Sequence, residues 1–353
     1  MMRRAAQKKP GMMQVAMYYS NDDIRLQKML TPTIGRKEVL MRIEASGICG
    51  SDAMEWYRAD KVPLVLGHEV SGVLVGVGGG VKKFRLGDRV VVTHHVPCGR
   101  CEYCQNGHPT VCETLRKTSF YPGGFSQFIR VPAINIARGM LSLPKGMTFE
   151  EGTFVEPLGC ALRGQRLAGM KKGKRVLVIG SGLSGLLHIK LARFFGAKKI
   201  IATDVDPYRL KAARKFGATT IRAGDDVPAK VKKICSGRLA DLVIICSAAQ
   251  SAVESALRSV ERGATVLFFS AAQKDEVLPV STNDIFWRSE VTLLSSYAAS
   301  PADLKDALQL IAKKKIVVRD MITHRLKLKN IQKGFRLVAK PKHSMKVIIE
   351  PQE

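Results

Sequence analysis

Residues 175–268 alternate between short apolar runs and segments in which apolar residues recur at helical spacing. The run RVLVIG is followed by a glycine-rich turn, a periodic segment that stops at Gly196, and the run KIIATD. The strand-like runs TTIRA, ADLVIICS and ATVLFFS then alternate with the helix-like VPAKVKKIC and SAVESALRSVERG. Alternation of this kind predicts a doubly wound parallel sheet, and therefore an α/β protein.

The rest of the chain has a different pattern. Residues 13 to about 155 are rich in Val and Gly, and runs such as EVLMRIEA, VSGVLVGVG and DRVVVTH predict a β-rich, barrel-like domain. The tail carries the helix-like PADLKDALQLIAKK and LKNIQKGFRLVAK and a last strand, MKVIIEP. We expect a disordered basic extension at 1–12, a β-rich domain at 13–160, an α/β domain at 161–297 and a mixed tail at 298–353.

The glycine-rich turn has the spacing of a dinucleotide-binding motif. Gly180, Gly182 and Gly185 form GxGxxG where the first strand of the α/β domain meets its first helix, and Leu183 lies at the start of that helix. This pattern lets the backbone approach a pyrophosphate at the helix N-terminus.

An acid at the end of the next strand bears on the choice of coenzyme. Asp204 stands where a carboxylate can bond the ribose hydroxyls and repel a 2′-phosphate, which favours NAD over NADP. Capping of the following turn is the alternative role for Asp204. Arg209 is near enough in sequence to neutralise a phosphate.

Four of the eight cysteines lie in the short stretch PCGRCEYCQNGHPTVC: Cys98, Cys101, Cys104 and Cys112. This spacing lets one loop offer four thiolates at tetrahedral corners, which predicts a structural zinc lobe at 98–112. An iron–sulfur cluster also takes four thiolates, but its bacterial pattern ends in Cys-Pro, whereas Glu113 follows here. Three histidines flank the lobe and are expected to be surface or hydrogen-bonded side chains rather than ligands: His94, His95 and His108.

A second set of potential ligands is more widely spread: Cys49 in SGICGSD, His68 and Glu69 in LGHEVSG, and Glu156 in FVEPLGC. Each of these residues alone could have an ordinary structural role: His68 and Glu69 could form a buried pair, and Glu156 could cap a helix. Together they supply one thiolate, one imidazole and two carboxylates, which suits a catalytic zinc with one position open. The sequence therefore predicts two zinc ions per chain.

The net charge of +27 is high for 353 residues, and residues 161–353 carry 36 Lys and Arg against 16 Asp and Glu. Nucleic acid, an acidic membrane or a phosphorylated substrate could use such a field. No basic stretch is interleaved with aromatic residues, so we expect a solvated Lys-rich surface and no nucleic-acid partner. Since no long apolar window and no secretory signal pattern occur, we expect a cytoplasmic protein without a membrane partner.

Together these motifs resemble the zinc-containing medium-chain alcohol dehydrogenases, in particular their sorbitol and L-threonine dehydrogenase branch. The resemblance extends from about Met13 to Pro351 and rests on GICGSD, GHEVSG, GVKKFRLGDRVVV, the cysteine lobe, VEPLGC and VLVIGSGLSGLL in that order. It implies a GroES-like catalytic domain, formed by the N-terminal half and the returning tail, together with a Rossmann coenzyme domain. It also implies an alcohol substrate and a homodimer or homotetramer.

The resemblance implies roles for three further residues. Ser51 would pass the alcohol proton towards solvent, and Asp52 would orient the ligand His68. Lys346, in the last strand, would approach the coenzyme phosphates, with an exposed surface lysine as the alternative. The implied reaction is zinc-dependent transfer of hydride from a secondary alcohol, such as a polyol, a cyclitol or a hydroxy amino acid, to NAD.

The substrate stays open at this point because two positions depart from the family pattern. Met54 stands where many sorbitol and threonine enzymes have His, and Ser296 stands before Tyr297 where polyol enzymes have Arg. An L-threonine 3-dehydrogenase and a phosphorylated-polyol dehydrogenase are therefore alternatives on the same fold. The alternative from another class is a non-catalytic, zinc-stabilised binding protein with a basic surface.

Overall fold

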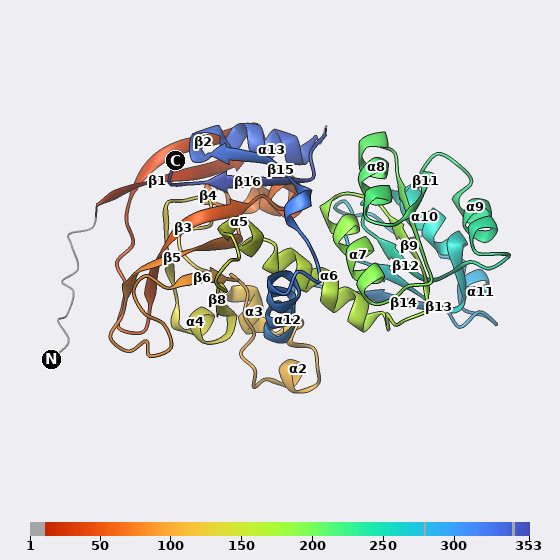
Figure 1. Cartoon of the computed structure of the whole chain (residues 1–353), viewed down its shortest axis with the longest axis horizontal. Coiled ribbons are helices and arrows are strands. Elements are labelled where there is room, and N and C mark those ends of the chain that lie inside the picture. The colour runs from red at the N-terminus through yellow and green to blue at the C-terminus, as the bar shows by residue number, and fades with distance from the viewer. Residues whose placement is uncertain (1–10, 279, 341–342) are drawn as a thin grey trace. The chain divides into compact units, whose positions relative to one another are not determined.

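The structure is a computed structural model that describes residues 11–278, 280–340 and 343–353 (Figure 1). Its contacts divide the chain into two compact units: the first holds the chain up to Glu156 and again from Val318, and the second is Pro157–Val317. Within the described ranges, no helix is long and apolar enough to cross a membrane. The extension expected at 1–12 lies outside the described residues as far as residue 10, and Met12 already belongs to a strand.

The first unit is built mainly on antiparallel strands. In β3 (Val39–Gly47), Met41 and Ile43 are buried and Arg42 between them is exposed, which is the alternation of a strand with one covered face. Its larger sheet has seven strands in the order β15-β16-β3-β5-β6-β8, with β7 also paired to β3, and its smaller sheet has the order β2-β1-β4.

The remaining strands of the first unit are β1 (Met12–Ser20), β2 (Asp23–Leu30), β4 (Leu64–Val65), β5 (Glu69–Val77), β6 (Arg89–Val92), β7 (Phe128–Val131), β8 (Met140–Ser142), β15 (Ile322–Lys327) and β16 (Lys346–Glu350). Its helices are α1 (Glu55–Arg58), α2 (Glu102–Gln105), α3 (Glu113–Lys117), α4 (Ala133–Gly139), α5 (Phe149–Gly152) and α13 (Ile331–Ala339). Short 3-10 helices occur at Gly50–Ala53, Ala59–Lys61, Pro109–Val111, Arg319–Met321 and Leu328–Asn330.

The second unit is a six-stranded parallel sheet in the order β11-β10-β9-β12-β13-β14, which confirms the doubly wound sheet expected from the sequence. Its strands are β9 (Arg175–Ile179), β10 (Lys199–Asp204), β11 (Thr219–Arg222), β12 (Ala240–Ile245), β13 (Val260–Phe268) and β14 (Thr292–Ser295). Its helices are α6 (Val155–Leu167, beginning at the unit boundary), α7 (Leu183–Phe194), α8 (Pro207–Lys215), α9 (Val227–Ile234), α10 (Gln250–Ser259), α11 (Thr282–Ile285) and α12 (Pro301–Ala312).

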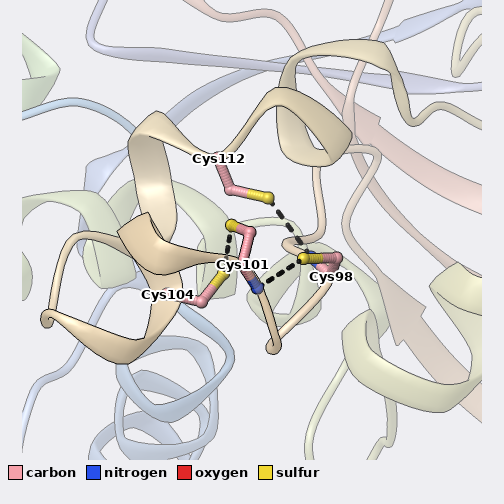
Figure 2. Close-up of side chains that lie close together, drawn as sticks. All are labelled: Cys98, Cys101, Cys104 and Cys112. Atoms are coloured by element: carbon pink, nitrogen blue, oxygen red, sulfur yellow. Dashed lines mark hydrogen bonds between the residues drawn. The ribbon is translucent and has the colours of Figure 1, made fainter.

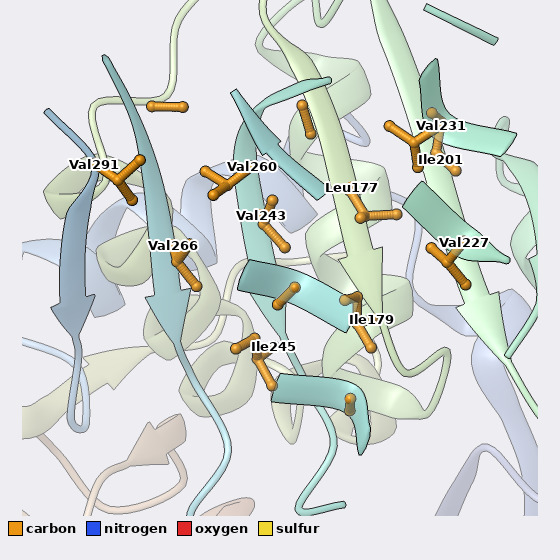
Figure 3. Close-up of a cluster of buried hydrophobic side chains, with 14 of the residues drawn as sticks. Leu177, Ile179, Ile201, Val227, Val231, Val243, Ile245, Val260, Val266 and Val291 are labelled. Atoms are coloured by element: carbon orange, nitrogen blue, oxygen red, sulfur yellow. The ribbon is translucent and has the colours of Figure 1, made fainter. Parts of the chain in front are cut away.

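The central strands β9, β10 and β12 are buried on both faces, so they consist of nearly continuous apolar runs, whereas the edge strands β11 and β14 are partly exposed. Figure 3 shows side chains of this core, among them Leu177, Ile179, Val243 and Ile245. Helix α7 contacts α8, and α9 contacts α10. Such neighbouring pairs are expected when right-handed crossover connections place helices on both faces of a parallel sheet. The strand order reverses between β9 and β12, which is where open α/β sheets bind ligands.

One predicted helix is shorter than its sequence pattern. Residues 251–263 were expected to be helical, but α10 ends at Ser259 and β13 begins at Val260. Val260 pairs with Ala240 of β12 and is 8% exposed, so burial in the sheet overrides the helical periodicity of this segment.

Helix α12 lies in the second unit, whereas the sequence placed everything after residue 297 in the tail. Ser300 caps the helix, and its hydroxyl accepts the N–H of Asp303. The Asp303 carboxylate in turn accepts a hydrogen bond of 3.0 Å from Arg166 on α6. These contacts hold α12 against α6, and the returning segment begins at Val318.

Candidate active site and metal centres

The four cysteines of the predicted lobe converge (Figure 2). Their sulfur atoms all lie within 4.8 Å of one another. The N–H of Cys101 donates to Cys98 Sγ at 3.3 Å, and the N–H of Cys98 donates to Cys112 Sγ at 3.4 Å. Such donors lower the pKa of Cys98 and, against the opposing effect of burial, bring the pKa of Cys112 to about 6. Burial raises the pKa of the third thiol, Cys104, to about 12. Four sulfurs at this spacing form the donor set of a tetrahedral structural zinc site.

A second group of potential ligands is assembled by neighbouring strands of the larger sheet. Cys49 follows β3, His68 immediately precedes β5, and Glu69 is the first residue of β5. Gly47 of β3 pairs with Glu69, so the two strand ends meet. The ligand atoms of Cys49, His68 and Glu69 lie within 4.8 Å of one another. Among the described residues Glu156, in the first turn of α6, is not part of this group.

Asp52 lies behind His68 in the 3-10 helix that follows Cys49. Its carboxylate is fully buried, its Oδ1 lies 3.2 Å from His68 Nδ1, and its Oδ2 accepts the N–H of Cys49 at 3.0 Å. Although burial opposes both effects, the contact lowers the pKa of Asp52 and raises the pKa of His68. A carboxylate at Nδ1 fixes the ring and leaves Nε2 as the metal-binding nitrogen. Ser51 lies in the same 3-10 helix.

Glu69 and Lys346 form a buried ion pair beside Gly47. Glu69 is 1% and Lys346 0% exposed, and the Lys346 ammonium contacts Glu69 Oε2. The other oxygen, Glu69 Oε1, is buried and has no hydrogen-bond partner in the described part of the chain. A buried, unpartnered carboxylate oxygen beside a thiol and an imidazole fits a divalent metal such as zinc. Lys346 is therefore not an exposed surface lysine, and its contact with a coenzyme phosphate stays a prediction.

Replacing Gly47 with Ala is expected to disrupt this ion pair. An added Cβ would collide with Glu69 Oε2 and would lie 2.5 Å from Lys346 Nζ, so one charged group would have to move. Because positioning contacts commonly change metal affinity by about 10- to 100-fold, we expect a loss of at least about tenfold in zinc affinity at this site. The measurement is zinc retained after dialysis against a chelator. Gly50→Ala is the control, since its Cβ would meet nothing within 4 Å; equal zinc loss from both variants would contradict the assignment.

Two histidines that the sequence associates with the cysteine lobe lie beside His68. The ring centroid of His94 is 4.8 Å from that of His68 and 3.7 Å from that of His95. Burial, reinforced by the charge of His68, holds the pKa of His94 well below its usual value and that of His95 at about 4. Both rings are therefore neutral near pH 7. The pairing of β5 with β6 creates this contact, which no local sequence signal reveals.

The glycine turn of the second unit is built for close backbone approach. Gly180 follows β9 with φ +93°, and a Cβ there would lie 2.6 Å from the carbonyl oxygen of Cys246. A Cβ on Gly185 would collide with the carbonyl oxygen of Gly180. Gly182 is the N-cap of α7, and Leu183 is its first residue. Only glycine therefore fits at positions 180 and 185. The N-terminus of α7, which follows this turn, is the kind of site at which backbone N–H groups bind a pyrophosphate.

Asp204 connects the end of β10 to this turn. Its carboxylate accepts the N–H of Ser181 at 2.8 Å and the N–H of Asp206 at 2.9 Å. Asp204 therefore caps the following turn, which was the alternative role considered from the sequence, and it also contacts the glycine turn. Arg209 Nη1 lies 3.8 Å from the Asp204 carboxylate, and its guanidinium lies over Gly182. Asp204 and Arg209 thus stand together at the carboxyl ends of the strands.

Comparison with known proteins agrees with this architecture. Residues 35–144 match the family described as alcohol dehydrogenase GroES-like domain, and residues 185–313 match the family described as zinc-binding dehydrogenase. The chain is 31% identical over 331 residues to sorbitol dehydrogenase 1 of Saccharomyces cerevisiae, covering 89% of this chain and 90% of that protein. It is 30% identical over 332 residues to the D-xylulose reductase of the same yeast, covering 90% and 91%.

A solved structure of a Sinorhizobium meliloti protein bound to NADP is similar over 97% of this chain and 100% of that chain, with 29% identity and a TM-score of 0.86. The GroES-like domain, the Rossmann coenzyme domain and the zinc-dependent dehydrogenase class expected from the sequence are confirmed. The chain is a zinc-dependent alcohol or polyol oxidoreductase that belongs to the medium-chain alcohol dehydrogenases, in their sorbitol dehydrogenase branch.

Proposed function

We propose that this enzyme transfers hydride between NAD and a secondary alcohol: a polyol, a cyclitol or a hydroxy amino acid. The observation that carries the proposal is the cluster of Cys49, His68 and Glu69, whose three donor atoms are one short of a tetrahedral set. Zinc held there would lower the pKa of a hydroxyl bound at the open position. Glu156 is proposed as a direct or water-mediated fourth partner.

Several residues of the chain have supporting roles in this proposal. Asp52 keeps the His68 ring oriented, and Lys346 occupies Glu69 Oε2 so that one carboxylate oxygen faces the metal. Ser51 accepts the proton of the alcohol and passes it towards solvent. Gly180, Gly182, Leu183 and Gly185 would hold the pyrophosphate of the coenzyme, and Asp204 and Arg209 would bind its ribose.

Metal analysis and a substrate panel test the proposal. Zinc per chain is measured together with NAD reduction by polyols, inositols, L-threonine and phosphorylated polyols. A site that hydrogen-bonds particular hydroxyl, ammonium or phosphate groups rejects analogues lacking them by large factors, so the best substrate separates the alternatives. About two zinc ions per chain with turnover of one class supports the proposal. One zinc ion and no turnover would leave only the cysteine lobe.

The coenzyme preference is tested by Asp204→Asn. Asn keeps an acceptor for the N–H groups of Ser181 and Asp206 but removes the charge that repels a 2′-phosphate. We expect the ratio of kcat/KM with NADP to kcat/KM with NAD to rise by roughly 10- to 100-fold, equivalent to about 1.4–3 kcal/mol. Asp206→Asn, which alters only the cap of α8, is the control. An unchanged ratio in Asp204→Asn would remove the basis for preferring NAD. The outcome is open to measurement because a structurally similar protein has been solved with NADP bound.

We also propose a homodimer or homotetramer in the cytoplasm. Closed symmetric assembly is the general expectation for such enzymes. All eight cysteines are free of disulfides, in keeping with a reducing compartment. Sedimentation of the purified protein measures the subunit number.

A further inference from the structure

Positive charge is concentrated at one edge of the parallel sheet in the second unit. Between Glu156 and Asp204 the sequence has ten Lys and Arg and no acidic residue. Strands β9 and β10 begin at this edge, and helices α7 and α8 end there. The sequence predicts a solvated Lys-rich surface and no nucleic-acid partner, but the fold gathers seven exposed cations at this edge, which we call the basic edge: Lys171, Lys172, Arg193, Lys198, Lys199, Arg214 and Lys215.

Contacts between the loops make the basic edge one continuous surface. The N–H of Gly173 donates to the carbonyl of Gly196 at 2.9 Å, joining the loop before β9 to the loop before β10. The Lys172 side chain lies 3.2 Å from the position a Cβ of Gly196 would take. Arg193 Nη1, at the end of α7, lies 3.1 Å from the corresponding position of Gly217, just after α8.

The charge of the basic edge is not neutralised locally. Among the described residues, none of its seven side chains forms an ion pair, and two acids near the amino ends of the neighbouring strands β12 and β13 are already paired: Asp241 with Arg175 and Glu261 with Arg238. Cations in the last turn of a helix offset its dipole, which accounts for Arg193, Arg214 and Lys215. The lysines at 171, 172 and 198 lie in loops, so that explanation does not apply to them.

Coenzyme binding does not explain this charge either. Gly180 follows β9 and Asp204 ends β10, so both lie at the carboxyl ends of the strands. Strands of five and six residues span about 16–20 Å. The basic edge is at the amino ends, separated from the coenzyme groups by the length of the sheet.

An exposed aromatic ring is adjacent in the chain to one of these cations. Phe194, next to Arg193 at the end of α7, is 43% exposed, and its ring packs edge-on against Phe195 at 5.3 Å between centroids. Cations that follow a phosphate backbone, combined with an aromatic ring on which a base can stack, are the elements of single-strand recognition. A membrane surface would require a helix with an exposed apolar face, whereas Leu186, Leu187 and Ile189 of α7 are buried. We propose that the basic edge and Phe194 bind single-stranded nucleic acid, independently of the dehydrogenase site.

The test uses the full-length enzyme and two charge-reversal variants of equal net charge. One is Lys171→Glu/Lys172→Glu/Lys198→Glu in the basic edge; the other is Lys313→Glu/Lys314→Glu/Lys315→Glu, three exposed lysines after α12. Binding of a fluorescein-labelled oligouridylate of about 20 nucleotides is followed by anisotropy between about 50 and 200 mM salt. We expect the basic-edge variant to lose at least about tenfold in affinity and its salt slope to shrink by about 2, and the control to lose less than about threefold.

Phe194→Ala separates stacking from charge. It should weaken binding by about fivefold or more without changing the salt slope, because a stacked ring contributes no counterion release. The dehydrogenase activity of all three variants should match that of the parent. A loss of nucleic-acid binding can therefore be distinguished from a failure of the proposed dehydrogenase function. Three results would overturn the proposal: no binding by the parent, equal losses in the two charge-reversal variants, or an unaltered affinity in Phe194→Ala. Capture of the parent by phosphatidylserine vesicles in place of oligouridylate would identify a membrane surface as the partner instead.

Discussion

Cys49→Ser is expected to abolish NAD reduction by alcohols and to release one of two zinc ions per chain. Ser retains the size of Cys but offers a weakly acidic hydroxyl where zinc binds a thiolate. The site then keeps only two of its three clustered ligands, His68 and Glu69. Loss of the metal removes several kcal/mol of stabilisation of the developing negative charge, so activity should fall by more than about a thousandfold. Zinc content and kcat/KM with the best alcohol are the measurements.

The matched control for this variant is Cys235→Ser. Cys235 is a thiol in the apolar core of the second unit, remote in sequence from both metal-binding groups. It should keep both zinc ions and most of its activity. If Cys49→Ser keeps two zinc ions and its activity, the cluster at Cys49 is not the catalytic centre.

Cys112→Ser is expected to have the largest effect on stability. The lobe at 98–112 contains only α2, of four residues, and a 3-10 helix of three residues, and the five-residue α3 follows it; helices this short are not stable alone. The free energy of zinc binding by four thiolates is therefore the main source of order in the lobe. Loss of the lobe zinc should lower the unfolding midpoint by roughly 10 °C, since each kcal/mol shifts it by about 2–4 °C.

Differential scanning calorimetry with zinc analysis measures this effect. His108→Ala is the control, because His108 is exposed beside the lobe and is not a member of the four-sulfur group. An unchanged midpoint in zinc-free Cys112→Ser protein would show that packing alone holds the lobe.

Local motifs could be interpreted from the sequence because their partners are close along the chain. The four cysteines lie within 98–112, and the glycine turn lies within six residues, so spacing alone indicates which atoms converge. The alternation of strands and helices was equally informative, because strands covered by helices on both faces appear in the sequence as short apolar runs separated by segments of helical periodicity. The end of α10 was misplaced because residues 260–263 fit a helical pattern, although they belong to β13, which pairs with β12 at Val260 and again from Thr265.

The environment of Glu69 could not be predicted in this way. Lys346 is 277 positions away, and it reaches Glu69 because β16 lies beside β3 and β3 beside β5. Neither strand order nor register follows from alternation within single strands. One signal was present: Lys346 stands in a strand that otherwise has apolar residues at every covered position, and a cation at such a position is costly unless paired.

The position of β16 sets an order in which the protein can be completed during its synthesis. The four-sulfur lobe uses a single stretch near residue 100 and can acquire its metal as soon as that stretch has left the ribosome. The centre at Cys49, His68 and Glu69 lacks its buried counter-charge until Lys346, 277 positions after Glu69, has been synthesised and has paired with it. A nascent chain therefore passes through a stage at which the lobe can hold its metal while the second centre is still incomplete.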